Sequence, residues 1–208
     1  MNMRLRSKLP IERISPDQFN TIVAPAELIV ADLNGPKVLK LPNGNMIKLF
    51  RRKRLLSSAM FAPYAVRFVN NAFRLKELGI PTITPVQILH CAELSIHAVE
   101  YQPLQGELLR GLLQESGSDD LFARTAQFIA ELHKKGVYFR SLHFENVISS
   151  QGQLGLIDIA DMKIYPGALS ASLRKRNFDH FLRYPADAEL ISRFGRERFE
   201  SIYTQALG

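Results

Sequence analysis

Two charged residues lie where the sequence is otherwise apolar, which makes them the first candidates for chemistry. Lys48 is flanked by Met46-Ile47 and Leu49-Phe50, a setting that favours a buried stem over an exposed strand lysine. Asp158 closes the apolar run 154–157, where a carboxylate is costly to bury without a partner. The ordinary alternative for Asp158 is a loop cap. We expect an ammonium and a carboxylate in such places to hold charged or polar partners.

Further polar residues follow in a fixed order along the chain. The extended segment 100–103, Glu-Tyr-Gln-Pro, joins a strand-rich first half to a helical second half. The candidates of the second half lie in one loop and just after one hairpin: Ser141, His143, Asn146, Asp158 and Asp161. Ligands commonly bind at the junction of two such halves.

The first half predicts a sheet with one helix. Strands are expected at residues 26–32, 37–41, 46–50, 86–91 and 94–101. The second and third are joined by Pro42-Asn43-Gly44-Asn45, and Asn-Gly between two strand-like runs is a strong hairpin signal. A helix is expected over 63–78, before Gly79 and Pro81. Five residues at helical spacing form its expected inner face: Tyr64, Phe68, Asn71, Leu75 and Leu78.

The second half is expected to be mainly helical. Helices are predicted over 106–114 and from Asp119 or Asp120, as the cap, to Lys135, and a hairpin over 147–157. The tail from Leu173 predicts two amphipathic helices broken at Pro185. The fold class is therefore α+β. Its expected parts are a loosely ordered basic lead-in (1–24), a five-stranded sheet with one helix (25–101) and a helical part (102–208).

Composition narrows the class of protein. A hydrophobic content of 46% and a charged content of 23% are typical of a soluble globular chain with a core. No apolar run has the length of a membrane span, and the N-terminus lacks the apolar stretch of a secretory signal, so we expect a cytoplasmic protein. The single cysteine, Cys91, excludes an intramolecular disulfide and is expected to be a small buried apolar residue.

The net charge of +7 suits nucleic acid, an anionic membrane or a phosphorylated substrate. The densest basic cluster is Arg51-Arg52-Lys53-Arg54. It has no interleaved aromatic residues and no nucleic-acid-binding motif accompanies it, which argues against nucleic acid.

The ordered set resembles the protein kinase-like superfamily and, within it, the bacterial lipopolysaccharide kinase family that acts on the lipopolysaccharide core or Kdo. The resemblance covers about residues 25–205. It rests on the segment 75–81 (Leu-Lys-Glu-Leu-Gly-Ile-Pro), on the loop 136–146, and on the tail 174–183, which contains Asn177, Phe178, Asp179 and Phe181. It implies a bilobal fold with a small N-terminal antiparallel sheet lobe, one helix and a reduced helical C-terminal lobe.

For the nucleotide, ATP, the resemblance implies a set of binding residues. Lys48 would pair with its phosphates, and the backbone of Glu100, Tyr101 and Gln102 would read the adenine. His143 would either contact phosphate or tie its own loop together.

For Mg²⁺, the resemblance implies oxygen ligands from the second half. Asp158 would be the principal catalytic metal ligand and Asn146 a second one, because both supply hard oxygen donors. Asp161 would be either a further ligand or a turn cap.

The catalytic loop departs from the family pattern at the residue that should accept the hydroxyl proton. This position, five residues before Asn146, is Ser141, where kinases have aspartate. A serine hydroxyl stays protonated at neutral pH, and a general base contributes about 10²–10⁴-fold to rate. Phosphoryl transfer depends mostly on positioning and charge stabilisation, so this loss need not abolish activity. Glu145 is a possible substitute base.

Other positions also differ from the family. Phe139-Arg140 replaces the usual His-Gly or His-Arg, and Asn71 stands where a glutamate would pair with Lys48. Residues 32–35 are the whole turn between the first two strands, without a glycine-rich phosphate loop. These departures bear on activity more than on fold.

Three functions follow from the resemblance. The first is an ATP-dependent phosphotransferase acting on a lipopolysaccharide core sugar or Kdo hydroxyl, with an anionic lipopolysaccharide precursor or the inner-leaflet membrane surface as its partner. The second is a pseudokinase, a nucleotide-binding or scaffold protein that regulates a cell-envelope process. The third, a protein serine/threonine kinase, is disfavoured by the short stretch after Asp161 and the lack of Ala-Pro-Glu. A cytoplasmic protein, peripheral at the inner membrane, would suit the first.

Overall fold

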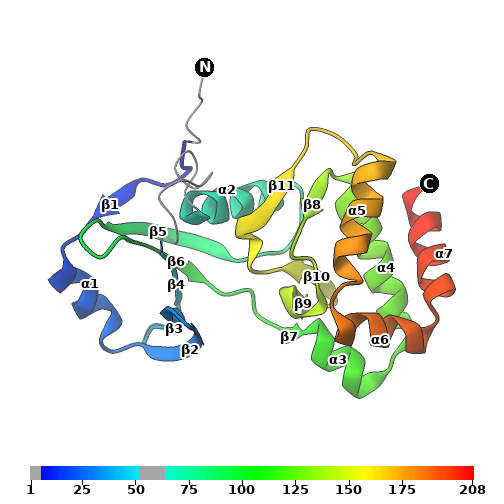
Figure 1. The fold of residues 1–208 in the computed structure, drawn as a ribbon, viewed down its shortest axis with the longest axis horizontal. Helices are drawn as coiled ribbons and strands as arrows, with labels where there is room; N and C mark the ends of the chain where they lie inside the picture. Colours follow the sequence, from blue (N-terminus) through cyan, green and yellow to red (C-terminus); the bar gives the residue numbers. More distant parts are fainter. Residues whose placement is uncertain (1–5, 52–63) are drawn as a thin grey trace. The chain divides into compact units, whose positions relative to one another are not determined.

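The structure, a computed structural model, describes residues 6–51 and 64–208 and has the expected α+β class (Figure 1). The chain forms two compact units. One, here called the sheet unit, takes Met1–Phe73 and Ile83–Pro103, and the other, the helical unit, takes Arg74–Thr82 and Leu104–Gly208. Of the predicted basic cluster only Arg51 is described, and the expected helix start at Pro63 also lies outside the described residues.

The sheet unit contains a six-stranded sheet of order β1-β5-β6-β4-β3-β2. Its strands are β1 (Ile11–Arg13), β2 (Glu27–Asp32), β3 (Gly35–Lys40), β4 (Met46–Arg51), β5 (Thr84–Cys91) and β6 (Ile96–Gln102). The five expected strands all form, and neighbouring pairs among them are antiparallel. The sixth strand, β1, pairs parallel with β5. A count of five strands was therefore wrong.

The predicted loosely ordered lead-in was also wrong for the described residues before position 24. Helix α1 (Pro16–Val23) follows β1 and begins with a capping box, in which Ser15 and Gln18 bond each other's backbone N–H groups. Pro16 occupies the first helical turn, where its missing N–H costs nothing. Phe19 of α1 joins a buried cluster with residues of β3, β4, β5 and β6, including Cys91, which is buried as expected.

Helix α2 (Tyr64–Glu77) packs on the sheet through a face slightly rotated from the expected one. Phe68 is 1% exposed, and its ring centre lies 5.7 Å from that of Phe50 and 5.4 Å from that of Tyr101. Tyr64, expected on this face, is 44% exposed, whereas Ala65 is fully buried. The predicted helix was correct, but its inner face was centred one residue away.

Among the described residues, the helical unit contains five short strands, two short 3₁₀ helices (labelled η) and five α-helices. They are β7 (Glu107–Leu108), α3 (Leu109–Ser116), α4 (Asp119–Lys134), β8 (Val137–Phe139), η2 (Phe144–Asn146), β9 (Val147–Ser150), β10 (Gln153–Leu156), η3 (Ile159–Asp161), β11 (Met162–Ile164), α5 (Ala171–Phe181), α6 (Pro185–Phe194) and α7 (Arg196–Leu207). The strands form two small sheets, β10-β9-β7 and β11-β8. The expected hairpin is β9–β10, whereas β7, β8 and β11 were not predicted.

Several helix boundaries in this unit differ from the prediction. The helix expected over 106–114 spans Leu109–Ser116. Ser118, not Asp119 or Asp120, caps α4, because its side chain accepts from the N–H of Leu121. The tail breaks at Pro185 as expected but also at Gly195, so it has three helices. Helices α4, α5 and α7 lie side by side (Figure 1), and α4 packs on α7. No helix in the described part of the chain is long and apolar enough to cross a membrane.

Candidate functional site

Two chain connections of the helical unit carry all five of its candidate residues. The first runs from β8 to β9 and contains Ser141, His143 and Asn146, and the second runs from β10 to β11 and contains Asp158 and Asp161. Because β9 pairs with β10 and β8 pairs with β11, both connections bridge the same two small sheets. A backbone hydrogen bond of 3.0 Å from the Ile157 N–H to the Asn146 carbonyl ties them together. The topology thus brings the five residues into one site.

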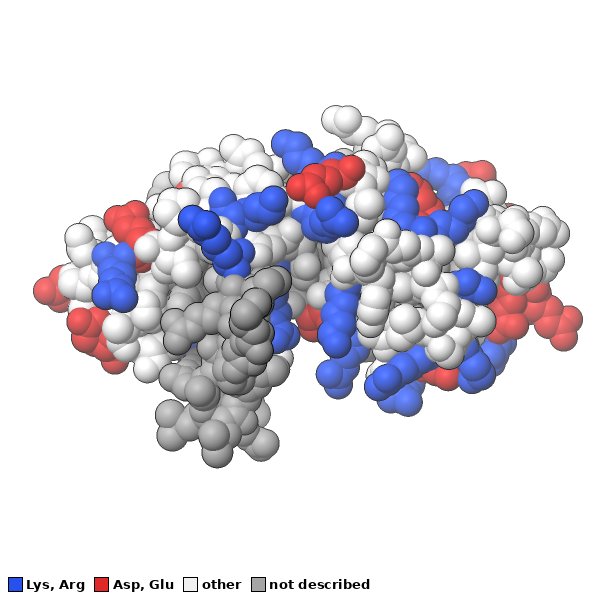
Figure 2. All heavy atoms as spheres, turned by 90° about the horizontal axis from the view of Figure 1, so that it is seen from above, with Lys and Arg blue, Asp and Glu red and all other residues white. Residues whose placement is uncertain are grey.

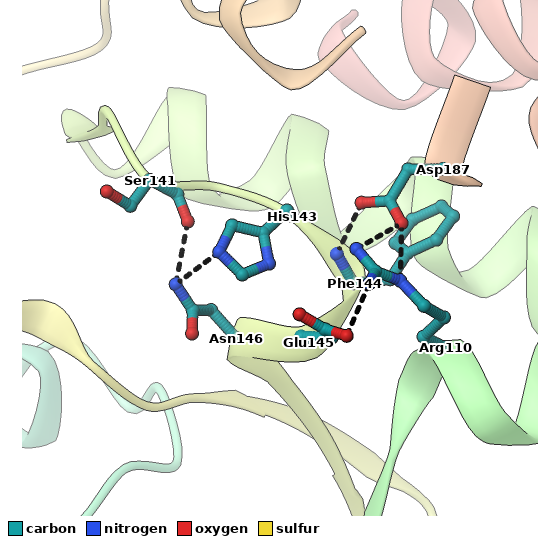
Figure 3. A network of polar contacts seen from close by, with 7 residues as sticks. All are labelled: Arg110, Ser141, His143, Phe144, Glu145, Asn146 and Asp187. Carbon is teal, nitrogen blue, oxygen red and sulfur yellow. Dashed lines mark hydrogen bonds and ion pairs between the residues drawn. The ribbon is translucent and has the colours of Figure 1, made fainter. Parts of the chain in front are cut away.

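The side chain of Asn146 is held in one orientation by its own loop. Its Nδ2 donates to the Ser141 carbonyl at 2.9 Å and to His143 Nε2 at 3.0 Å (Figure 3). Because a carbonyl can only accept, this end of the amide must be the nitrogen. Both N–H groups are used, so the amide oxygen is the atom left to bind a cation. Asn146 is only 7% exposed, which limits its freedom to turn.

His143 ties the loop together, which is one of its two expected roles. Since its Nε2 accepts from Asn146, the proton of the neutral ring is on Nδ1. That Nδ1 is buried and has no hydrogen-bond partner in the part of the chain that the structure describes. Burial is the largest of several influences on the pKa of His143, and it lowers that pKa, which favours the neutral ring. The ring also packs on Tyr184, with centres 4.4 Å apart.

Asp158 has a backbone conformation that is uncommon for a residue with a side chain. Its φ of 52° and ψ of 42° place it in the left-handed region. Aspartate tolerates this region better than most residues, and such conformations cluster at functional sites. Burial raises the pKa of Asp161 and lowers the pKa of His143, and in both cases the negative charge of Asp158 acts toward a higher pKa.

Ser141 and Asp161 are joined directly. The Ser141 hydroxyl donates to Asp161 Oδ2 at 2.5 Å. The other carboxylate oxygen, Oδ1, is buried and without a hydrogen-bond partner among the described residues. Burial raises the pKa of Asp161 and Asp158 adds to this, while the bond from Ser141 and the charge of Arg140 oppose it. Ser141, at the position where kinases have aspartate, therefore has a carboxylate directly beside it.

A buried ion pair holds the middle of the loop. Asp187, fully buried, accepts from Nε and an NH group of Arg110 at 2.8 Å each and from the Phe144 N–H at 2.7 Å (Figure 3). Arg110 also pairs with Glu145. Glu145, considered as a substitute base, is thus engaged by a guanidinium in this structure. Sequence reasoning missed Asp187, although an aspartate just after Pro185 is a helix-start signal.

A second buried network fixes β8, the strand from which the loop starts. The side chain of Asn177 accepts from the Phe139 N–H at 3.2 Å and donates to the Phe139 carbonyl at 2.7 Å. Its oxygen also contacts His133 Nε2 at 3.2 Å, and His133 Nδ1 contacts the Tyr203 hydroxyl at 2.7 Å. Asn177 therefore links α5 to α4 and β8, a role that its place in the tail motif did not reveal.

In the sheet unit, Lys48 has the predicted buried position. It lies in β4 opposite Val99 and is 5% exposed. Its ammonium is 5.6 Å from the ring centre of Phe68, within reach of a cation–π interaction. The residues on either side of Lys48 point to the opposite face of the sheet. This alternation explains how a lysine stem is accommodated within an apolar strand.

The expected adenine-reading segment lies mostly inside the sheet. Glu100 has β4 on one side and β5 on the other, and Tyr101 is opposite Met46 at the end of β4. Gln102 pairs only with Thr84, so it has a strand on one side alone. The Glu100 carboxylate accepts from three amides, at 2.6 Å from both Asn45 and Gln87 and at 3.4 Å from Asn43. Burial raises the pKa of Glu100, but these bonds together outweigh it and lower the pKa overall.

Comparison with known proteins supports the fold alone. No protein family and no curated protein matches the sequence. A solved structure of WaaP in complex with acyl carrier protein matches with a TM-score of 0.50 and 17% identity, over 90% of this chain and 93% of that chain. The chain has a protein kinase-like fold.

The oxygen donors of the site are compatible with a Mg²⁺ ion that is held jointly by the protein and a nucleotide. In the described residues no three His, Cys, Asp or Glu side chains gather as a metal site. Mg²⁺ binds through one or two protein oxygens together with nucleotide phosphates and water. Asn146, with its oxygen left for a ligand, and Asp158, in its strained turn, match this requirement. Asp161 is instead bonded to Ser141 through one oxygen.

Proposed function

We propose that the protein is a Mg²⁺- and ATP-dependent phosphotransferase of the lipopolysaccharide kinase type, which phosphorylates a sugar hydroxyl of an anionic lipopolysaccharide precursor. The observation that carries this proposal is the fixed amide of Asn146 beside the Asp158 turn, joined by the Ile157–Asn146 backbone bond. The structural similarity to WaaP supports the kinase-like fold that this proposal requires.

Each candidate residue has a task in this proposal. Bound Mg²⁺ neutralises charge on the nucleotide phosphates. Asn146 and Asp158 would supply its protein oxygens, and Lys48 would hold the phosphates with its buried ammonium. Gln102 pairs with β5 but not with β4, so its backbone would be more accessible to the adenine than that of Glu100, which has a strand on both sides.

An anionic acceptor is supported by the charges beside the loop. Arg140, Arg176 and Arg183 are exposed. Burial lowers the pKa of His180, the positive charges of these three arginines lower it further, and the charge of Asp179 opposes them. Over the face drawn in Figure 2, basic groups are spread between acidic ones, consistent with local binding sites rather than one continuous basic surface. Guanidinium groups bind phosphate bidentately, which suits a phosphorylated acceptor.

The second candidate is a pseudokinase that binds Mg-ATP without transferring phosphate to an acceptor. Ser141 at the proton-accepting position is the observation that favours it. This form of the protein would act through a partner at the cell envelope. Acyl carrier protein, present in the WaaP structure, is one partner to test, because an acidic protein would suit a chain of net charge +7.

Isothermal titration with ATP, with and without Mg²⁺, tests both candidates at the level of binding. We expect Mg²⁺ to tighten ATP binding to the wild type, and we expect Asp158→Asn and Asn146→Ala to abolish that gain. Asp179→Asn is the matched control, because Asp179 is an exposed carboxylate paired only with Lys175 in the described chain. If Mg²⁺ tightens binding equally in all four proteins, the assigned metal ligands are wrong.

Phosphate transfer separates the two candidates. Radiolabelled ATP with a purified lipid A-core acceptor should label the acceptor if the protein is a phosphotransferase. Binding of Mg-ATP without labelling of the acceptor, and without ADP release above the Asp158→Asn level, would support the pseudokinase instead.

A further inference from the structure

We propose that Ser141 and Asp161 form a proton relay, in which Asp161 is the final acceptor of the proton that the acceptor hydroxyl loses. The inference deepens the proposed phosphotransferase function and rests on it. It gives the catalytic loop a base although its usual aspartate is absent.

The hydrogen bond between the two side chains has the direction that a relay needs. A serine hydroxyl has one proton and two lone pairs. In this structure the proton of Ser141 points to Asp161 Oδ2 at 2.5 Å, since a carboxylate only accepts. The lone pairs of Ser141 Oγ therefore remain for a second hydroxyl, that of the acceptor sugar.

The Asp161 carboxylate has the capacity to take the proton. Its Oδ1 is buried and without a hydrogen-bond partner among the described residues, and Ser141 donates to the other oxygen, Oδ2. Asp161 is half-buried, but leaving one of its oxygens buried without a partner is costly, and native proteins satisfy most such atoms. The site thus maintains an under-solvated carboxylate directly behind the residue at the base position.

The relay residues are held in place by groups other than each other. The carbonyl of Ser141 accepts from Asn146, which fixes the serine backbone. Asp161 ends η3, between the strained turn at Asp158 and β11, and β11 pairs with β8, the strand before Ser141. The two side chains therefore meet because two paired strands bring their connections together, not because either residue is near the other in sequence.

The step conserves atoms and charge. The acceptor oxygen forms a bond to the γ-phosphorus of ATP while the bond from that phosphorus to the bridging oxygen breaks. ADP leaves with that electron pair. The acceptor proton passes to Ser141 Oγ as the Ser141 proton passes to Asp161 Oδ2, so serine ends neutral and Asp161 ends as a carboxylic acid. The proton is released to solvent before the next turnover.

A purely structural hydrogen bond makes different predictions from a relay, and a residue swap distinguishes them. Ser141→Asp alone would place two carboxylates in contact, and such a pair holds one proton between them rather than offering a free base. The double variant S141D/D161S moves a single carboxylate to the family's position. We expect Ser141→Asp alone not to raise transfer, and the swapped variant to keep transfer within about tenfold of wild type.

Single-turnover transfer to the lipid A-core acceptor is the first measurement. Asp161→Asn and Ser141→Ala should each lower the rate by about 10²–10⁴-fold. The double variant S141A/D161N should be no slower than either single variant, because the residues act as a unit. The affinity for Mg-ATP should stay within about threefold of wild type. Glu200→Gln, which changes a surface carboxylate of α7 paired with Arg196, is the control and should leave both quantities unchanged.

A second measurement uses the protein without nucleotide. Urea unfolding of wild type, Ser141→Ala, Asp161→Asn and the double variant S141A/D161N gives the free energy of coupling between the two side chains. We expect the unfolding equilibrium constant of the double variant to differ by about tenfold or more from the product of the two single effects.

The outcomes separate the two proposals. If Asp161→Asn transfers phosphate as fast as wild type, the relay is wrong and the phosphotransferase proposal still stands. Absence of coupling in the unfolding cycle would overturn the hydrogen bond and the relay with it. A wild type that binds Mg-ATP but transfers nothing to the acceptor would remove the phosphotransferase proposal, and the relay would fall with it.

Discussion

Acidification should destabilise the helical unit through one buried histidine, His133. Its ring is 1% exposed and lies between the Tyr203 hydroxyl and the Asn177 side chain. Burial lowers the pKa of His133 to about 4, with the Asn177 hydrogen bond opposing this and the charge of Arg174 adding to it. Because Asn177 also bonds both backbone groups of Phe139, a charge on His133 would disturb β8, the strand from which the β8–β9 connection starts.

The sign of the effect follows from the two protonation states. A histidine in the unfolded chain has a pKa near 6.5, so below that pH the unfolded state binds a proton that the folded state resists. Stability from the neutral ring is present above about pH 6.5 and is lost as the pH falls toward about 4. Between about pH 7 and about pH 5, a shift from 6.5 to about 4 amounts to a loss of about 2 kcal/mol in the free energy of unfolding.

The assay compares wild type with His133→Gln by urea unfolding at about pH 7 and about pH 5. Far-ultraviolet circular dichroism and tyrosine fluorescence are suitable probes, since the chain has no tryptophan. Glutamine can donate toward Asn177 and accept from Tyr203 but does not titrate. Wild type should lose about 2 kcal/mol more than the variant between the two pH values. Other titrating groups, including His97, whose burial and neighbour His90 lower its pKa to about 4, affect both proteins equally.

Equal losses in the two proteins would refute the reasoning. That result would mean that His133 is not held neutral by its buried position, or that the Asn177 network adapts to its charge. A larger loss in the variant than in the wild type would contradict the sign itself.

Two further substitutions test the scaffold of the site. Asn177→Ala should lower the free energy of unfolding by about 3 kcal/mol, because it leaves the buried backbone groups of Phe139 and His133 Nε2 without partners; chemical unfolding at neutral pH measures this, and a loss below about 1 kcal/mol would contradict it. Gly155→Ala should cost about 1–3 kcal/mol, since a Cβ on this buried strand would meet the Pro81 carbonyl and Leu104 Cδ2 at 2.6 Å each. Its control, Gly111→Ala in α3, where a Cβ meets nothing within 4 Å, should raise stability by about 0.5–1 kcal/mol, and a destabilised control would show that the glycine geometry was misjudged.

The elements that sequence reasoning placed correctly are those with strong local patterns. Asn-Gly between two apolar runs gave the β3–β4 hairpin, and helical spacing gave α2 and α4. The elements it missed are short or depend on distant partners. Strand β1 has three residues and exists because β5 offers it an edge, although the Ser15–Gln18 capping box that follows was a readable local signal.

The candidate site divides along the same line. Composition and order picked out Asn146 and Asp158, and the structure brings their two connections together. The contacts that fix the loop join residues 20 to 43 positions apart: Ser141 with Asp161, Asn177 with Phe139, and Asp187 with Phe144. No spacing in a single sequence encodes such pairs, because they depend on how β8, β11, α5 and α6 pack.

Ser141, which departs from the kinase pattern, and its hydrogen-bond partner Asp161 are best interpreted together. Ser141 alone suggests a chain that has lost its catalytic base. The half-buried carboxylate of Asp161 is bonded to that serine, so under the proposed relay the proton acceptor lies one side chain further back. A carboxylate oxygen that is buried without a partner among the described residues, near a second aspartate, costs stability. A site that must receive a proton gives a physical reason for that cost, which is why we propose a phosphotransferase first and a pseudokinase second.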